Sequence, residues 1–175
     1  MKIIKCEMKH LDALTKLYDK VTEYLVSHIN YPKWTPGVYP GRESIREAIE
    51  KGIQYACFDV DKAVGAFILN EDPQGAYSEG EWVTDAEEGE FLVIHTLASD
   101  PECYGKGTGK RMVDFCIETA KECQKKAVRL DVVPDNIPAR KLYEKMGFVF
   151  AGEKDLKRGI EEIPTFVLYE YPVKK

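Results

Sequence analysis

The sequence predicts a mixed α/β (α+β) domain built on a central sheet. Apolar runs of strand length alternate with segments whose apolar residues recur every three or four positions, the helical spacing. Two apparent hairpins argue against a purely parallel sheet and favour a mixed one. With 175 residues, 44% of them hydrophobic, the chain can bury the core of one compact domain, residues 1–175.

The first part of the chain opens with a strand and a helix. Strands are expected at Ile3 to Cys6, Tyr55 to Phe58 and Val64 to Leu69, and helices from His10 to about Val26 and from Arg42 to Lys51. The second and third of these strands should pair antiparallel. Between the helices, Ser27 to Gly41 holds three prolines and three aromatic residues, which predicts an irregular but shaped loop.

The second part of the chain begins with a polar, acidic segment, Asn70 to Gly89, which predicts a loop, with a short strand near Gly80 to Val83 as an alternative. Phe91 to Ala98 is apolar on both alternating faces except at His95 and Thr96, as in a strand at the middle of a sheet. The remaining elements are a helix around Met112 to Cys123, a strand at Val128 to Val133, a helix at Asn136 to Met146, and strands at Phe148 to Phe150 and Ile163 to Tyr171.

Composition excludes several classes of protein. The net charge of −5 disfavours nonspecific nucleic-acid binding, which needs excess Lys and Arg. Five cysteines without a CxxC pair predict reduced thiols, and three dispersed histidines predict no metal site. No apolar run is long enough to cross a bilayer and the N-terminus does not resemble a signal peptide, so a cytoplasmic protein is expected.

The most informative segment is Tyr104 to Gly109, Tyr-Gly-Lys-Gly-Thr-Gly, between a buried strand and a helix. Exposed backbone N–H groups and the helix dipole can form an anion site there, and Lys106 and Lys110 add positive charge. A tight turn with solvated lysines is the alternative. The Rossmann pattern fails because Lys110 and Met112 occupy the positions of its last glycine, and the Walker pattern fails at Tyr104 and Arg111.

Two motifs carry a family resemblance. Leu97-Ala98-Ser99-Asp100-Pro101-Glu102 followed by Tyr104 to Gly109 is similar to the "LAV-x-P-E" and [R/Q]xxGxG/A hallmarks of the GCN5-related N-acetyltransferase (GNAT) superfamily. Asn136 to Phe148 resembles the second hallmark, "NxxAxxLYxKxGF". The resemblance implies a GNAT-like fold, a central, mostly antiparallel twisted sheet of about seven strands with about four helices.

The resemblance also implies an enzyme that uses acetyl-CoA, or another acyl-CoA, as co-substrate. It implies that the loop amides hold the CoA diphosphate, that the preceding strand and an asparagine contact pantetheine, and that a tyrosine protonates the departing thiolate. The implied coenzyme-binding residues are Leu97, Ala98, Ser99, Tyr104, Gly105, Lys106, Gly107, Thr108, Gly109, Lys110, Asn136, Arg140 and Tyr143. Tyr104 departs from the Arg or Gln of the family pattern, and Ser99 from its valine.

Two residues are candidates for catalysis. Attack on a thioester needs a neutral amine, so a base is expected near the acceptor. His95 matches the position of a histidine in the arylalkylamine N-acetyltransferases, although a buried histidine can be purely structural; Glu79, Glu81 or Glu90 acting through water is the fallback. Tyr143 is the candidate acid, although its place in an apolar helical stripe is also explained by packing.

The acceptor is predicted only as an amine, on a small molecule or a peptide. The aromatic residues Tyr31, Trp34 and Tyr39 could form a wall of its pocket or pack on the core, and the acidic run Asp85 to Glu88 could favour a cation. The alternatives are a CoA-binding regulatory module without turnover and a nucleotide-binding enzyme. No nucleic-acid or membrane partner is expected, and the chain could be a monomer or a homodimer.

Overall fold

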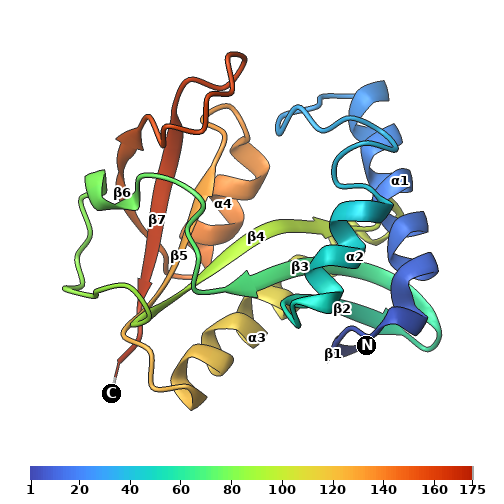
Figure 1. Cartoon of the computed structure of the whole chain (residues 1–175), viewed down its shortest axis with the longest axis horizontal. Coiled ribbons are helices and arrows are strands. Elements are labelled where there is room, and N and C mark those ends of the chain that lie inside the picture. Colours follow the sequence, from blue (N-terminus) through green and yellow to red (C-terminus); the bar gives the residue numbers. More distant parts are fainter. Residues whose placement is uncertain (175) are drawn as a thin grey trace. The chain divides into compact units, whose positions relative to one another are not determined.

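The structure of the chain is a computed structural model that describes residues 1–174. Seven strands form one mixed sheet in the order β1-β2-β3-β4-β5-β7-β6, and four α-helices accompany it, as Figure 1 shows along the chain. The strands are β1 (Lys2–Lys5), β2 (Gln54–Asp59), β3 (Lys62–Asn70), β4 (Phe91–Ser99), β5 (Ala127–Val132), β6 (Val149–Lys154) and β7 (Phe166–Pro172). The helices are α1 (Leu11–Ser27), α2 (Arg42–Glu50), α3 (Thr108–Glu122) and α4 (Ile137–Lys145).

The mixed sheet and the helix count predicted from the sequence are confirmed. The loop predicted before β4 is confirmed, and the alternative of a short strand at residues 80–83 was wrong, because the backbone N–H of Val83 donates to the Glu170 carboxylate instead of to a neighbouring strand. A strand boundary was also wrong. The last strand begins at Phe166, not at Ile163, because the residues before it form a turn-rich loop with Gly159 in the left-handed region (φ 69°).

The chain divides into two compact units, and β4 and α3 contribute residues to both. The first unit holds residues 1–69 and 95–112, and the second holds residues 70–94 and 113–174. In the first unit, β2 pairs antiparallel with β1 and with β3, and the second of these pairings confirms the predicted hairpin.

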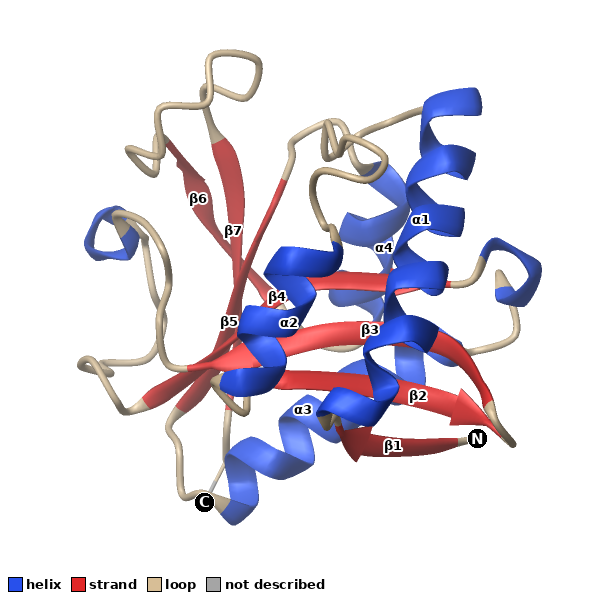
Figure 2. Cartoon of the chain, turned by 45° about the vertical axis from the view of Figure 1, so that its right-hand side comes forward, coloured by secondary structure: helices blue, strands red, loops and turns tan. Residues whose placement is uncertain are grey.

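Helices α1 and α2 cover one face of β1 to β3 (Figure 2). The core between them is made of apolar side chains from both helices and from alternate strand positions, including Leu14, Ile45, Ala56 and Ala66. Because side chains alternate along a strand, Gly65 faces the other side of the sheet. There α3 begins: a Cβ built on Gly65 would lie 2.8 Å from Met112 Sδ and 3.0 Å from Thr108 Cγ2. The glycine therefore lets the start of α3 approach β3 closely.

The second unit is built around β5, which pairs parallel with the start of β4 and antiparallel with β7. Strand β6 forms the outer hairpin with β7. Its core is a cluster of apolar residues from these strands and from the segment before β4, among them Tyr77, Phe91, Val93 and Leu168.

A buried ion pair holds the segment before β4 in this unit. Arg129 on β5 is 3% exposed and Glu170 on β7 is fully buried, with Arg129 Nε 3.1 Å from Glu170 Oε1. The guanidinium carbon also lies over the rings of Trp82 (4.2 Å from its centroid) and Phe91 (4.3 Å). The second oxygen of Glu170 accepts the backbone N–H groups of Val83 (2.9 Å) and Thr84 (3.0 Å). The pair thus replaces strand pairing for residues 82–84.

Candidate active site

The second half of β4 carries the candidate base and the implied pantetheine contacts, all in the first unit. His95, Leu97 and Ser99 are half-buried and Ala98 is buried. Between them, Thr96 adopts a left-handed backbone conformation (φ 48°), which is rare for a β-branched residue. Its carbonyl accepts a hydrogen bond from the Tyr18 hydroxyl at 2.8 Å, and burial raises the pKa of Tyr18, so this donor keeps its proton.

A buried carboxylate follows directly after β4. Asp100 has a side chain that is 1% exposed, and its Oδ1 lies 2.8 Å from Lys20 Nζ and accepts the backbone N–H of Glu102 at 2.9 Å. Lys62 Nζ lies 2.9 Å from Oδ2 and forms a second ion pair with this carboxylate. Burial alone would raise the pKa of Asp100, but the two ammonium groups and the N–H outweigh it and lower the pKa to about 2.

The glycine turn comes next, and its conformation requires glycine. Gly105 (φ 76°) and Gly107 (φ 82°) are both in the left-handed region, where a side chain would be strained. A Cβ built on either glycine would meet no atom within 4 Å, so crowding by the protein is not the reason for glycine here. The backbone is therefore open to a ligand on that side.

Helix α3 starts inside this turn and adds the features of an anion site. Its first residue, Thr108, is 1% exposed, and the first N–H groups of any helix have no partner within the helix. Lys106, Lys110 and Arg111 are exposed around it. A diphosphate fits this arrangement: bare backbone approaches it, helix N–H groups point to it and cations balance it.

Tyr104, which precedes the first glycine, is 48% exposed and turned toward α1. Its ring meets the ring of Tyr24 edge-on, with centroids 5.5 Å apart and an interplanar angle of 83°. The departure from the Arg or Gln of the family pattern thus gives the turn an aromatic contact within the protein.

The second unit holds Asn136, Arg140 and Tyr143, all at or on α4. Asn136 is the N-cap of this helix, since its Oδ1 accepts the backbone N–H of Ala139 at 3.2 Å. The guanidinium of Arg140 donates to the Tyr169 hydroxyl and to the Pro134 carbonyl, both at 3.1 Å. Asn136 therefore has its amide NH₂ available, whereas Arg140 already has two partners in the protein.

Tyr143 is 6% exposed and packs against Phe148, with ring centroids 5.5 Å apart. Burial, followed by the nearby Cys116 and Asp131, raises the pKa of its phenol, so the hydroxyl stays protonated at neutral pH. Within residues 1–174, no hydrogen bond occupies that hydroxyl. The Tyr143 ring therefore packs in the core, and its hydroxyl remains able to donate a hydrogen bond; packing and chemistry, which are alternatives from the sequence alone, are compatible here.

The aromatic loop divides into an anchored and an exposed part. Trp34 packs edge-on against Tyr18 (6.2 Å) at the core, and its backbone exchanges two hydrogen bonds with the Asn30 side chain. Tyr31 is half-buried and Tyr39 is 46% exposed. Trp34 thus has the packing role that was the alternative for this loop, and Tyr31 and Tyr39 offer more of their rings to a ligand.

The fallback bases lie in the second unit. The ion pair of Glu90 with Lys126 (2.6 Å) and the N–H of Glu87 lower the pKa of Glu90, which makes it a weaker base. Glu81 pairs with Lys154 at 3.0 Å, and Glu79 lies in a single turn of 3₁₀ helix. His95 is therefore the better candidate on chemical grounds.

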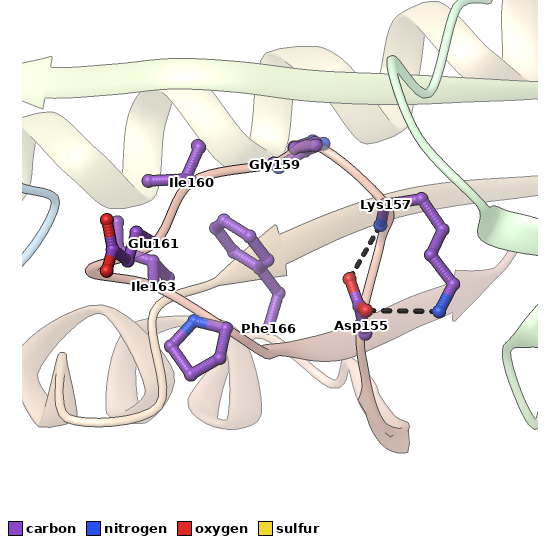
Figure 3. Close-up of a pocket in the computed structure, with 9 residues that line it drawn as sticks. Asp155, Lys157, Gly159, Ile160, Glu161, Ile163 and Phe166 are labelled. Atoms are coloured by element: carbon purple, nitrogen blue, oxygen red, sulfur yellow. Dashed lines mark hydrogen bonds and ion pairs between the residues drawn. The ribbon is translucent and has the colours of Figure 1, made fainter.

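A pocket in the loop between β6 and β7 was missed by the sequence analysis. It has a volume of about 450 Å³, and Ile160, Glu161, Ile163 and Phe166 are among the residues that line it (Figure 3). Arg158 fastens this loop, since its guanidinium contacts both oxygens of Asp131, at 2.7 and 2.9 Å. No local motif in residues 155–166 could reveal it, because the loop is shaped by a partner 27 residues away.

Two further features concern what the described residues lack. Within residues 1–174, no helix has both the length and the apolar character needed to cross a membrane. The same residues contain no group of three or more His, Cys, Asp or Glu side chains placed to hold a metal ion.

Comparison with known proteins identifies the family. The profile of the Acetyltransferase (GNAT) family matches residues 15–148. An acetyltransferase of the GNAT family from Streptococcus agalactiae has the same fold, with a TM-score of 0.81, 18% identity and coverage of 99% of this chain and 96% of that one. The structure of yncA from Salmonella typhimurium with its cofactor acetyl-CoA also shares the fold, with a TM-score of 0.67, 14% identity and coverage of 99% and 94%.

Among curated relatives, the spermine/spermidine N(1)-acetyltransferase of Bacillus subtilis is 34% identical over 95 residues, which is 47% of this chain and 62% of that protein. Another, the N-acetyltransferase MJ1207 of Methanocaldococcus jannaschii, is 32% identical over 78 residues, 45% of this chain, and the matched part spans about a third (33%) of its length. These matches, together with the glycine turn and the α4 motif, identify the class of the protein as acyltransferase. The chain belongs to the acetyltransferase (GNAT) family.

Proposed function

We propose that this protein is an N-acetyltransferase that transfers acetyl from acetyl-CoA directly to a primary amine on a small molecule or a peptide. The observation that carries the proposal is the turn at Gly105 and Gly107. Its two left-handed glycines and the empty space beside them suit a diphosphate at the start of α3. Family membership supports the same reaction.

The proposed roles follow from the chemistry of transfer. The amine nitrogen bonds to the acetyl carbonyl carbon, the carbon–sulfur bond breaks, and the amine loses a proton. His95 takes that proton, directly or through water, and the Tyr143 hydroxyl donates a hydrogen bond to the departing thiolate. The backbone of Leu97, Ala98 and Ser99 and the Asn136 amide hold the pantetheine arm.

Coenzyme binding is the first test. If acetyl-CoA binds the native state only, a concentration 100 times Kd stabilises the protein by about 2.7 kcal/mol. For a chain of this length that corresponds to a rise in Tm of roughly 5–10 °C, measured by differential scanning fluorimetry. ATP and NAD are the controls and should leave Tm unchanged. An unchanged Tm with acetyl-CoA would remove the proposal, and a rise with ATP or NAD alone would favour a nucleotide-binding enzyme.

Transfer itself is tested by release of free thiol in a panel of amines. The panel includes polyamines, because the B. subtilis relative is named for spermine and spermidine, together with amino acids and peptides with a free N-terminus or lysine. Thiol release with at least one amine is expected. Tight binding of acetyl-CoA without transfer to any amine would favour the regulatory module instead.

The glycine turn is tested by Gly107→Ala. Forcing a side chain into the left-handed region costs about 1–3 kcal/mol, and the Cβ would also occupy the ligand side of the turn, so we expect Kd for CoA to rise about tenfold or more. Isothermal titration calorimetry measures it. The matched control is Gly52→Ala, at a glycine with nearly the same conformation (φ 69°) just after α2. An equal effect of both variants on Kd would contradict a role for the turn in binding.

A further inference from the structure

One face of α1 carries two side chains, Lys20 and Tyr24, that contact the segment before the glycine turn, and His28 follows at the C-cap of the helix. Lys20, Tyr24 and His28 are four residues apart, so they lie above one another along the helix. Lys20 and Tyr24 contact residues 100–104, and all of these residues belong to the first unit. Helix α1 is therefore attached to this segment at two successive turns.

The first attachment is ionic. Lys20 Nζ lies 2.8 Å from Asp100 Oδ1 and 2.9 Å from Glu102 Oε2, and Lys62 on β3 joins the same two carboxylates, at 2.9 and 3.0 Å. Two ammonium groups thus balance two carboxylates, one of which is buried. This cluster fixes the start of the segment, residues 100–102, to α1 and β3.

The second attachment is aromatic. The edge contact between Tyr24 and Tyr104 lies at the last residue before Gly105. At the C-cap of α1, His28 stacks on Tyr24 with centroids 3.9 Å apart, and its Nδ1 lies 2.9 Å from the Tyr24 carbonyl oxygen. The Tyr24 ring is thereby held in one orientation, which makes it a defined partner for Tyr104.

The glycine turn has little packing of its own. Gly105, Lys106 and Gly107 are exposed, and the space beside both glycines is empty. Two backbone hydrogen bonds fix its ends, from Lys106 N–H to the Cys103 carbonyl (3.1 Å) and from Arg111 N–H to the Gly107 carbonyl (3.0 Å). A turn of this kind takes its shape from what holds its two ends, and a loop already in its bound shape loses less entropy on binding.

We propose that Tyr24 and Tyr104 are positioning residues for the CoA diphosphate: their ring contact fastens the glycine turn to α1 in the conformation that receives the ligand. This inference rests on the proposed function. Where the family pattern has Arg or Gln, this chain has Tyr104, whose ring contacts Tyr24 of the protein. Tyr104 acts through the turn, and Tyr24 acts through Tyr104.

The test is a double-mutant cycle with Tyr24→Leu and Tyr104→Leu. Kd is measured by calorimetry for CoA and for S-acetyl-pantetheine, which lacks the diphosphate. We expect each single variant to raise Kd for CoA about fivefold, the size expected for loss of one edge-on aromatic pair, and the double variant to raise it no further. Kd for S-acetyl-pantetheine should stay at the wild-type value. The matched control is Phe150→Leu, which removes an edge-on pair with Tyr169 (6.3 Å, 80°) and should leave both constants unchanged.

A second measurement does not depend on CoA. Amide hydrogen exchange of residues 104–109 in the unliganded protein should be faster in Tyr24→Leu than in wild type, because the turn loses its anchor. Both tyrosines are partly exposed, so the variants are expected to fold, and their Tm values check this.

Four other outcomes overturn the inference, and a fifth overturns the proposed function on which it rests. Weaker CoA binding in Tyr104→Leu alone would mean that this ring touches the ligand directly, and additive effects would mean that the two rings act independently. Equal weakening of both ligands, or unchanged exchange in the turn, would mean that the contact is only structural. Wild-type protein that fails to bind CoA, with faster exchange in Tyr24→Leu, would refute the proposed function while leaving the anchoring of the turn in place.

Discussion

Tyr143→Phe is expected to lower kcat about 100-fold, the size of effect seen when one preorganised donor to a developing negative charge is removed. The physical reason is the free hydroxyl of a ring that is otherwise buried. The ring contacts Phe148, and phenylalanine keeps that packing, so the change removes only the O–H donor. Kd for CoA should change little, because the donor acts chiefly on charge that develops during transfer.

The pH dependence separates a hydrogen-bond donor from a group that ionises. Burial raises the pKa of Tyr143 above its usual value near 10, so the phenol is protonated throughout the range from about pH 6 to pH 9. The ratio of wild-type to Tyr143→Phe kcat should therefore be constant across that range, as measured in steady-state assays. A ratio that falls as pH rises would mean that the hydroxyl loses its proton there.

Tyr77→Phe is the matched control for loss of a hydroxyl. Tyr77 is also buried in the second unit, but its hydroxyl donates to Asp131 at 2.6 Å. Its removal should lower Tm and leave kcat unchanged. If Tyr143→Phe behaves in the same way, Tyr143 is a packing residue and the proposed donor lies elsewhere.

Arg129→Met is expected to lower the free energy of unfolding by about 3–5 kcal/mol, because it leaves the charge of Glu170 buried without its partner. Urea denaturation followed by circular dichroism measures the loss. Glu170 keeps the two backbone N–H donors of Val83 and Thr84, so residues 82–84 should remain attached. This loss is large compared with the free energy of unfolding of a typical domain, about 5–15 kcal/mol.

Two further variants give this prediction its controls. The double variant Arg129→Met with Glu170→Gln should be more stable than Arg129→Met alone, since the amide carries no charge and its oxygen still accepts hydrogen bonds. Arg46→Met removes an exposed ion pair with Glu43 on α2 and should change the free energy of unfolding far less than Arg129→Met does, because water screens the exposed pair. A loss in Arg129→Met no larger than in Arg46→Met would show that the buried pair contributes little.

Most of the fold followed from local patterns in the sequence. The alternation of the strands and the three-and-four spacing of the helices identified the elements of the mixed sheet. The alternative strand at residues 80–83 was wrong, and several boundaries differ by a few residues, most clearly the start of β7 and the end of β6, which lies at Lys154 and not at Phe150. The alternative at residues 80–83 failed because Val83 and Thr84 bond to Glu170, 87 and 86 residues away, and such a contact leaves no local periodicity.

The parts of the candidate site that lie within short sequence motifs could be predicted. Gly105 and Gly107 were identified because the conformation of a turn demands a particular residue type. The burial of Asp100 and the contact between Tyr24 and Tyr104 were not, because the spacing of α1 reveals its apolar face and says nothing about the partner of its polar one. The pocket between β6 and β7 was not predicted either, because the loop that forms it is held by a contact between Arg158 and Asp131, 27 residues apart.

The absence of a Cβ atom at Gly65 makes possible a close contact between β3 and α3 that is not evident from the sequence. Because Met112 and Thr108 fill the place a side chain would take, the volume at position 65 sets how near the first turn of α3 can come to the sheet. A side chain at position 65 would displace the flexible end of Met112 and crowd the Thr108 methyl group, so a bulkier residue there is best accommodated together with a smaller residue at position 112.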